Sequence, residues 1–133
     1  MFTYNSIVSF SDSDPAGILF FGNYFKLAHF AYENLLTENG MYLKLFNSQN
    51  FIVPLVNSNA NYYSSLRSGE KFIIDLIVEN IGKSSFTLCF NFYSSQKIKS
   101  AEIKTTHVFV SKKTGKKILI PKEFKIFLQK FVK

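Results

Sequence analysis

The sequence predicts an α+β fold in which about five antiparallel strands form a curved sheet wrapped around one long helix. Phe and Tyr number 16 and 7 among the 133 residues, and both side chains favour the half-buried surface of a sheet. Only one segment has a strong helical period, whereas about five others are apolar runs of strand length bounded by turn residues. Packing the sheet on the helix buries the apolar surfaces of both in two layers.

The helix is predicted to begin near Asn23 and to run for about 16 residues. Its apolar positions recur at spacings of three and four residues, at Tyr24, Leu27, Ala28, Ala31, Leu35 and Leu36. Asn39 and Gly40 form a suitable C-terminal stop, because both residues tolerate the left-handed backbone conformation that ends many helices. We expect the apolar stripe of this helix to face the sheet.

The strands are predicted at residues 2–10, 52–63, 70–80, 84–95 and 98–111. Turn-forming residues separate the later strands at 68–69, 82–83 and 94–97. A short apolar stretch then ends at Pro121, and residues 122–131 read as a short helix or a frayed end. The strand at 70–80 is apolar on both faces, so we expect a second subunit to cover the outer face of the sheet. A homodimer or homotetramer is therefore predicted.

Composition and charge limit the classes of function. The chain has one cysteine, Cys89, which is expected to be a small buried residue, and no apolar run reaches the length of a membrane span. We expect a single domain over residues 1–133, located in the cytoplasm and without membrane insertion. The net charge of +7 suits an anionic partner such as a phosphate-bearing small molecule, or reflects only a solvated lysine-rich face. No nucleic-acid partner is expected, because no recognised binding motif is present.

The segment from Asp12 to Gly17 reads SDPA between its ends and predicts a turn. It is followed within a few residues by the start of the helix, where free backbone N–H groups and the positive end of the helix dipole gather. Such a terminus can bind the oxygen of a carbonyl group that becomes negative in a transition state. A carboxylate beside it could attack the carbonyl carbon or take a proton from an attacking water. These residues suit acyl transfer or hydrolysis, although the same sequence also forms ordinary turns.

The run from Phe10 to Leu36, FSDSDPAGILFFGNYFKLAHFAYENLL, resembles the signature of the hotdog-fold acyl-CoA thioesterases of the 4-hydroxybenzoyl-CoA thioesterase-like family. That signature is an Asp-x-Asp-x-x-Gly segment, an apolar run, and an Asn-Tyr pair that opens the central helix. The matching residues here are Asp12, Asp14, Gly17, Asn23 and Tyr24. Further matches are Pro54-Leu55-Val56, Tyr62 or Tyr63, Gly69-Glu70 and Gly82-Lys83-Ser84-Ser85-Phe86. The resemblance covers residues 4 to 110 and implies the hotdog fold, a curved antiparallel sheet around one helix.

The resemblance also implies roles for individual residues. Asp14 corresponds to the catalytic carboxylate of the family, acting as nucleophile or general base. The backbone N–H groups of Phe21 and Gly22 would polarise the thioester carbonyl. Many family members carry His or Pro at the position of Gly22, so no role of that histidine is carried over to this chain.

Four further residues are assigned smaller roles in the expected site. Asn23 and Tyr24 would shape the turn and the pocket, while Asp12 and Gly17 would shape the loop.

Other polar residues compete for a role in the site. Glu33 in the helix is the first rival for the catalytic carboxylate, with a structural or solvent-facing glutamate as the alternative. His29 is expected to pack or to hydrogen-bond, and His107 has no neighbour in the sequence that would form a nucleophilic pair with it. Lys83 and Arg67 are candidates for contacts with the phosphates of coenzyme A. No metal site is expected, because His and Cys residues show no ligand spacing.

We therefore expect an acyl-CoA thioesterase that releases a free acid and coenzyme A, with no cofactor, since coenzyme A is part of the substrate. Helix residues 27–36 and the block at 51–63 look closest to the family members that cleave 1,4-dihydroxy-2-naphthoyl-CoA. This resemblance implies an aromatic acyl group, such as that one or 4-hydroxybenzoyl. The alternatives are a short- or medium-chain aliphatic acyl-CoA thioesterase and a non-catalytic hotdog domain that binds acyl-CoA or an acyl-carrier partner.

Overall fold

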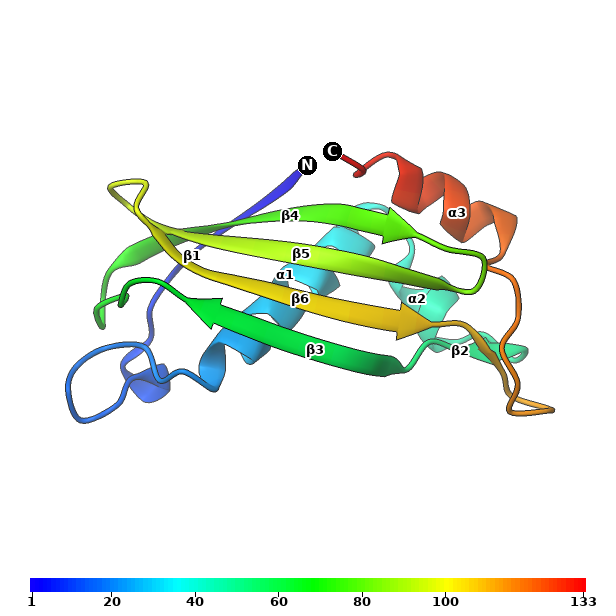
Figure 1. Cartoon of the computed structure of the whole chain (residues 1–133), viewed down its shortest axis with the longest axis horizontal. Coiled ribbons are helices and arrows are strands. Elements are labelled where there is room, and N and C mark those ends of the chain that lie inside the picture. Colours follow the sequence, from blue (N-terminus) through cyan, green and yellow to red (C-terminus); the bar gives the residue numbers. More distant parts are fainter.

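A computed structural model describes residues 1–133, and its five-stranded antiparallel sheet has the strand order β1-β4-β5-β6-β3. The strands are β1 (Phe2–Ile7), β3 (Leu55–Tyr62), β4 (Lys71–Ile81), β5 (Ser85–Ser94) and β6 (Lys99–Val108). Helix α1 (Asn23–Glu38) crosses one face of this sheet, as Figure 1 shows. The predicted α+β hotdog architecture is thus confirmed.

Helix α1 begins and ends where the sequence predicted. Leu27, Ala31 and Leu35 are buried on the stripe that faces the sheet, and the inward side chains of the central strands complete the core. The helix stops at Glu38, and Gly40 adopts a positive φ of 69° two residues later. Glycine reaches this conformation without steric cost, which explains the stop at this point.

Three predicted strands are shorter or divided in the structure. β1 ends at Ile7, because the Ser9 side chain accepts a hydrogen bond from the Ser11 N–H and caps a 3-10 turn, η1 (Phe10–Asp12). The predicted strand at 52–63 is divided into β2 (Phe51–Ile52) and β3, with Pro54, which has no N–H to donate, between them. Similarly, the strand at 98–111 is divided into β6 and β7 (Val110–Ser111), and β7 pairs with β2.

Two short helices accompany α1. The helix α2 (Tyr42–Phe46) was not predicted, because five residues are too few to reveal a helical period. The segment after Pro121 is a helix, α3 (Lys122–Gln129), rather than a frayed end. It buries Phe124, Phe127 and Leu128 in the core and lies beside the end of β4 in Figure 1. No helix is long and apolar enough to cross a membrane.

The outer face of the sheet is more polar than the strand at 70–80 suggested. Ile73 and Ile77 of β4 lie on this face and are half-buried. The neighbouring strands place ion pairs there, with Lys104 Nζ 2.8 Å from Glu79 Oε1 and Lys99 Nζ 3.1 Å from Glu102 Oε2. Several exposed apolar residues lie on or near β3 and α1, namely Phe20, Phe21, Phe30, Leu55, Val56, Tyr62 and Tyr63.

Candidate active site

The loop that carries Asp14 is held in shape by that residue itself. The Asp14 carboxylate accepts hydrogen bonds from the N–H of Ala16, at 2.9 Å, and of Ile18, at 3.4 Å. The Asp14 carbonyl accepts a further bond from the N–H of Gly17, whose φ of 77° requires glycine. Asp14 is half-buried and stands in the tight turn of residues 14–18, within the loop that leads to α1. One of its oxygens has no partner within the protein.

Asp12, two residues before Asp14, lies in a different environment. The residue is 7% exposed, and its carboxylate forms an ion pair with Lys26 of α1. The Asp12 carbonyl accepts hydrogen bonds from the Phe20 N–H at 3.0 Å and from the Asn23 side chain at 2.9 Å. These bonds tie both ends of the loop to the first turn of α1, which is the arrangement that a loop-shaping role requires.

The two residues directly before α1, Phe21 and Gly22, have free backbone N–H donors. Neither the Phe21 N–H nor the Gly22 N–H has a hydrogen-bond partner, whereas the Asn23 N–H donates to the Phe20 carbonyl. The Tyr62 hydroxyl of β3 donates to the Phe21 carbonyl at 3.1 Å and so holds the peptide unit that carries the Gly22 N–H. Free N–H groups at a helix start are suited to an oxygen that gains negative charge.

Tyr24 is directed into the core rather than toward solvent. It is 3% exposed, and its hydroxyl is 2.8 Å from the Ser100 Oγ. Burial raises the pKa of its phenol. The ring makes edge contacts with Tyr62 and Phe92, with ring centroids 5.2 Å and 5.1 Å away. Tyr24 therefore positions β3 against the start of α1.

The two candidates for coenzyme A contacts lie far apart in the protomer. Arg67 is exposed and its backbone pairs with Ile18 of the Asp14 loop. Lys83 is exposed in the β4–β5 turn, which lies at the other end of the sheet in Figure 1. One protomer therefore does not bring Lys83 to the loop.

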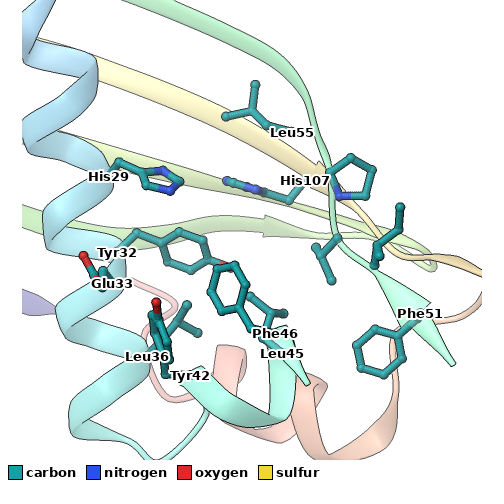
Figure 2. A pocket seen from close by; sticks show the side chains of 13 residues that line it. His29, Tyr32, Glu33, Leu36, Tyr42, Leu45, Phe46, Phe51, Leu55 and His107 are labelled. Atoms are coloured by element: carbon teal, nitrogen blue, oxygen red, sulfur yellow. The ribbon is translucent and has the colours of Figure 1, made fainter. Parts of the chain in front are cut away.

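A cavity of about 430 Å³ opens at the other end of α1 (Figure 2). Its walls come from residues 29–36 of α1, from α2, from the β2–β3 segment and from β6. The lining residues are His29, Tyr32, Glu33, Leu36, Tyr42, Leu45, Phe46, Phe51, Ile52, Val53, Pro54, Leu55 and His107. The cavity is mostly apolar with a few polar groups, as in most sites for organic ligands.

Two buried polar side chains face this cavity. Tyr32 is 6% exposed, and its hydroxyl has no hydrogen-bond partner in the protein. Every polar side-chain atom that is fully enclosed has such a partner. The Tyr32 hydroxyl is therefore not fully enclosed, and it opens to the cavity that the residue lines. Burial raises the pKa of this phenol far above its usual range. His107 hydrogen-bonds through Nε2 to the Thr105 Oγ1 at 2.9 Å, which leaves Nδ1 free. Burial, with a smaller effect of His29, lowers the pKa of His107 to about 4, so its ring is neutral at pH 7.

His29 and Glu33 lie at the mouth of the cavity on successive turns of α1. Figure 2 shows the His29 ring pointing at His107 across the cavity. Glu33 is half-buried and forms no ion pair. The sequence singled out these three residues one by one but did not identify Tyr32 or the cavity.

The signal for Tyr32 was weak. Its position on the buried stripe of α1 reads as core packing, and only a hydroxyl on that stripe marked it as unusual. Cys89 is buried as expected, on the outer side of β5, and burial raises the pKa of its thiol. No cluster of three His, Cys, Asp or Glu residues could hold a metal ion.

The sequence and the fold of this chain are similar to those of known proteins. The sequence profile of the thioesterase-like superfamily matches residues 8–128. The chain is 33% identical to a 1,4-dihydroxy-2-naphthoyl-CoA hydrolase of Prochlorococcus marinus, over 91% of this chain and 83% of the relative. It is 30% identical to the enzyme of that name from Crocosphaera subtropica, over 84% and 83%. A crystal structure of a 1,4-dihydroxy-2-naphthoyl-CoA thioesterase from Synechocystis superposes with a TM-score of 0.90, 22% identity, and coverage of 96% and 95%.

Proposed function

We propose that this chain, which belongs to the thioesterase-like superfamily, is an acyl-CoA thioesterase that hydrolyses 1,4-dihydroxy-2-naphthoyl-CoA or a closely similar aromatic thioester. The observation that carries the proposal is the combination of a carboxylate in the loop before α1 with two unpartnered N–H groups at the start of that helix. Acyl-CoA hydrolysis needs both a nucleophile or base and a site for the carbonyl oxygen.

The proposed reaction assigns one task to each group. The thioester carbonyl oxygen accepts hydrogen bonds from the N–H groups of Phe21 and Gly22 and becomes negative as its carbon is attacked. Asp14 either adds to that carbon or removes a proton from a water that adds to it. The carbon–sulfur bond breaks, and coenzyme A leaves as a thiolate that is protonated to the thiol. If Asp14 adds directly, water then hydrolyses the resulting anhydride and releases the acid.

We further propose that two copies of the chain pair along β3. β3 forms an edge of the sheet, because its only neighbour is β6, and nearly all of its side chains are exposed. An exposed edge strand flanked by apolar side chains is a template for pairing with another chain. A second copy of the chain can pair with the free backbone groups of this edge through its own β3, with the two strands antiparallel and related by a two-fold axis. The exposed apolar residues around β3 and the start of α1 would then be covered.

This pairing would also bring together Arg67 and Lys83, which lie far apart within one protomer. A two-fold axis near the middle of β3 places opposite ends of the two sheets side by side. The Arg67 side of one protomer then lies at the same end of the dimer as the partner's Lys83. We propose that these two cations contact the phosphates of one coenzyme A from different protomers. The buried, unpaired thiol of Cys89 fits a cytoplasmic location.

The proposal is tested by thiol release from a panel of aryl-, short-chain and long-chain acyl-CoA thioesters. We expect the aromatic thioesters to be preferred. Asp14→Asn should lower kcat by about a hundredfold or more, the scale of a lost base or nucleophile. Asparagine keeps the oxygen that caps the loop, so the loop should stay folded. Asp12→Asn is the control, with an effect mainly on stability through the ion pair with Lys26.

Near-normal turnover by Asp14→Asn would contradict the assignment of this residue. Preference for aliphatic thioesters would favour the alternative of a short- or medium-chain aliphatic acyl-CoA thioesterase. Binding of acyl-CoA without any hydrolysis would point instead to a non-catalytic domain.

A further inference from the structure

The net charge of the chain is concentrated in its last 29 residues. Residues 1–104 contain eight Lys or Arg and eight Asp or Glu, whereas residues 105–133 contain eight Lys and one Glu and so carry the whole net charge of +7. The single acid, Glu123, forms an ion pair with Lys44 of α2. All eight lysines are exposed, namely Lys112, Lys113, Lys116, Lys117, Lys122, Lys125, Lys130 and Lys133. This part of the surface therefore has a strong positive charge that the protein does not neutralise.

Most of these lysines lie at one end of the molecule. Figure 1 shows residues 112–129 running from the turn after β7 to α3 at the right-hand end, away from the Asp14 loop. The Ile120 N–H donates to the Lys83 carbonyl at 2.9 Å, which brings a further exposed lysine to this end. We call the surface formed by Lys83 and residues 112–130 the basic end. Its helix α3 packs on β4, which β5 and β6 separate from β3, so the proposed pairing along β3 leaves α3 uncovered.

The outward side of α3 carries an apolar side chain among its lysines. The inward side is buried and comprises Phe124, Phe127 and Leu128. At about 3.6 residues per turn, Ile126 lies on the opposite side, one turn after Lys122 and one turn before Lys130. Its exposed fraction is 50%, and that of Leu119, which precedes the helix, is 71%. Single exposed apolar residues are common, but two of them flanked by exposed lysines give this surface a specific chemistry.

The chemistry of the basic end favours an extended anionic surface with an apolar layer beneath it. Its lysines are spread along a helix and the segment before it, whereas a single phosphate group needs its cations gathered around one point. Nucleic acids are read largely by arginine and by stacked aromatic rings, but the basic residues here are all lysine, and Leu119 and Ile126 between them are aliphatic. A lipid bilayer with anionic headgroups attracts lysines at its surface and accepts aliphatic side chains just below it.

We infer that the basic end docks this protein on the surface of an anionic lipid bilayer. The lysines lie against the headgroups, while Leu119 and Ile126 enter the boundary between the headgroups and the acyl chains. The apolar side of α3 stays in the protein core, so the docking is peripheral and reversible. Each lysine that reaches the surface should raise the affinity about fivefold. The inference goes beyond the proposed function and does not depend on which thioester is cleaved.

Co-sedimentation of the full chain with lipid vesicles tests the docking. We expect binding to vesicles of phosphatidylglycerol and phosphatidylcholine in equal parts, weaker binding as salt is added, and no binding to phosphatidylcholine alone. Lys122→Gln/Lys125→Gln should lower the affinity about 25-fold, because two lysines of the basic end are lost. The matched control is Lys71→Gln/Lys97→Gln, which removes the same charge from two exposed lysines at the opposite end of the sheet and should change the affinity little.

A fluorescent probe tests the entry of the aliphatic side chains into the bilayer. The chain contains no Trp, so Ile126→Trp introduces a single indole on the outward side of α3. Its emission should shift to the blue when phosphatidylglycerol vesicles are added, because the ring leaves water. Ile98→Trp is the control, since Ile98 is similarly exposed, at 53%, in the turn between β5 and β6 and should show no shift. An unchanged emission of Ile126→Trp in the bound protein would overturn the entry of these side chains.

Three results of the vesicle experiment would overturn the docking itself. The first is failure of the wild-type protein to bind phosphatidylglycerol vesicles. The second is an equal loss of affinity in the two double variants, which would mean that net charge rather than the basic end drives binding. The third is complete release of the bound protein by duplex DNA at equal phosphate concentration, which would favour a nucleic-acid partner. Because binding is measured without turnover, the docking can fail while the thioesterase assay succeeds, and the reverse.

Discussion

The two ends of helix α1 differ in which polar groups lack a hydrogen-bond partner within the protein. At its start, one oxygen of the Asp14 carboxylate accepts hydrogen bonds from the loop backbone, and the Asp12 carboxylate pairs with Lys26. Two backbone N–H groups and the second Asp14 oxygen have no hydrogen-bond partner there. Toward its end, the Tyr32 hydroxyl and the Nδ1 of His107 on the facing strand β6 have no hydrogen-bond partner in the protein and open to the cavity.

This difference suits two different tasks. A backbone N–H group is removed only by substitution to proline and is placed by the fold, which suits a reaction step common to every thioester. Side chains differ freely between related proteins, which suits the choice of acyl group. In the proposed dimer, in which the two β3 strands pair antiparallel, the loop before α1 of one copy lies beside the cavity of the other.

Among the predictions that follow from comparing the two ends of α1, the largest effect is expected from separating the two copies. Asn59 lies at the middle of β3 with its side chain on the outer face, so in the proposed dimer it lies close to its own copy. Asn59→Lys places two like charges together there, and lysine on an edge strand opposes pairing. We expect mostly monomer at micromolar concentration and at least a tenfold lower activity per protomer, as measured by light scattering and thiol release.

The protomer itself should tolerate this substitution. Asn59 is opposite Lys104, and the carboxylates of Glu79 and Glu102 beside that lysine offset the added charge. Asn5→Lys on β1, the other edge of the sheet, is the matched control and should leave mass and activity unchanged. A dimer of undiminished activity with lysine at position 59 would show that pairing does not run along β3.

The features at the two ends of α1 also differ in how well they could be predicted from the sequence. The start of the helix at Asn23 and its stop before Gly40 followed from periodicity and glycine chemistry, which are local. The assignment of Asp14 rested on resemblance, because an Asp-Pro-Ala-Gly turn by itself is ordinary. The cavity was not predicted, since Tyr32 and His107 each read as core residues of separate elements. Their meeting depends on how α1 crosses β6, which no local pattern contains.

The cavity end should respond to pH through His107. Burial holds the pKa of this ring near 4, below its ordinary value of 6.5, with His29 across the cavity contributing in the same direction. The unfolded chain therefore binds more protons than the native protein between these values, so stability falls as pH falls through that window. We expect a loss of about 3 kcal/mol between pH 7 and pH 4 from this group.

Denaturant unfolding at several pH values, in wild type and in His107→Gln, measures this contribution. The variant should have a flatter pH dependence between pH 6.5 and pH 4, because the substituted side chain does not titrate. Equally steep curves for the two proteins would mean that other groups, such as the half-buried Glu33 at the cavity mouth, cause the acid sensitivity.

The smallest effect is expected at the helix start, from the hydroxyl of Tyr62. This group donates to the Phe21 carbonyl, and the same peptide unit carries the Gly22 N–H. A hydrogen bond to the carbonyl polarises the unit and fixes its plane, which strengthens the N–H as a donor to the developing oxyanion. Tyr62→Phe should lower kcat about fivefold, equivalent to about 1 kcal/mol, with little change in KM.

A matched control lies next to this tyrosine. Tyr63 is also exposed, but its hydroxyl forms no hydrogen bond and its ring lies under Lys99, with the Nζ 5.4 Å from the ring centroid. Tyr63→Phe should leave kcat unchanged. If Tyr62→Phe raised KM at constant kcat, the ring would only line the site. A fall in kcat alone would place the peptide between Phe21 and Gly22 at the oxyanion, because only there does orienting one N–H affect the transition state more than the bound substrate.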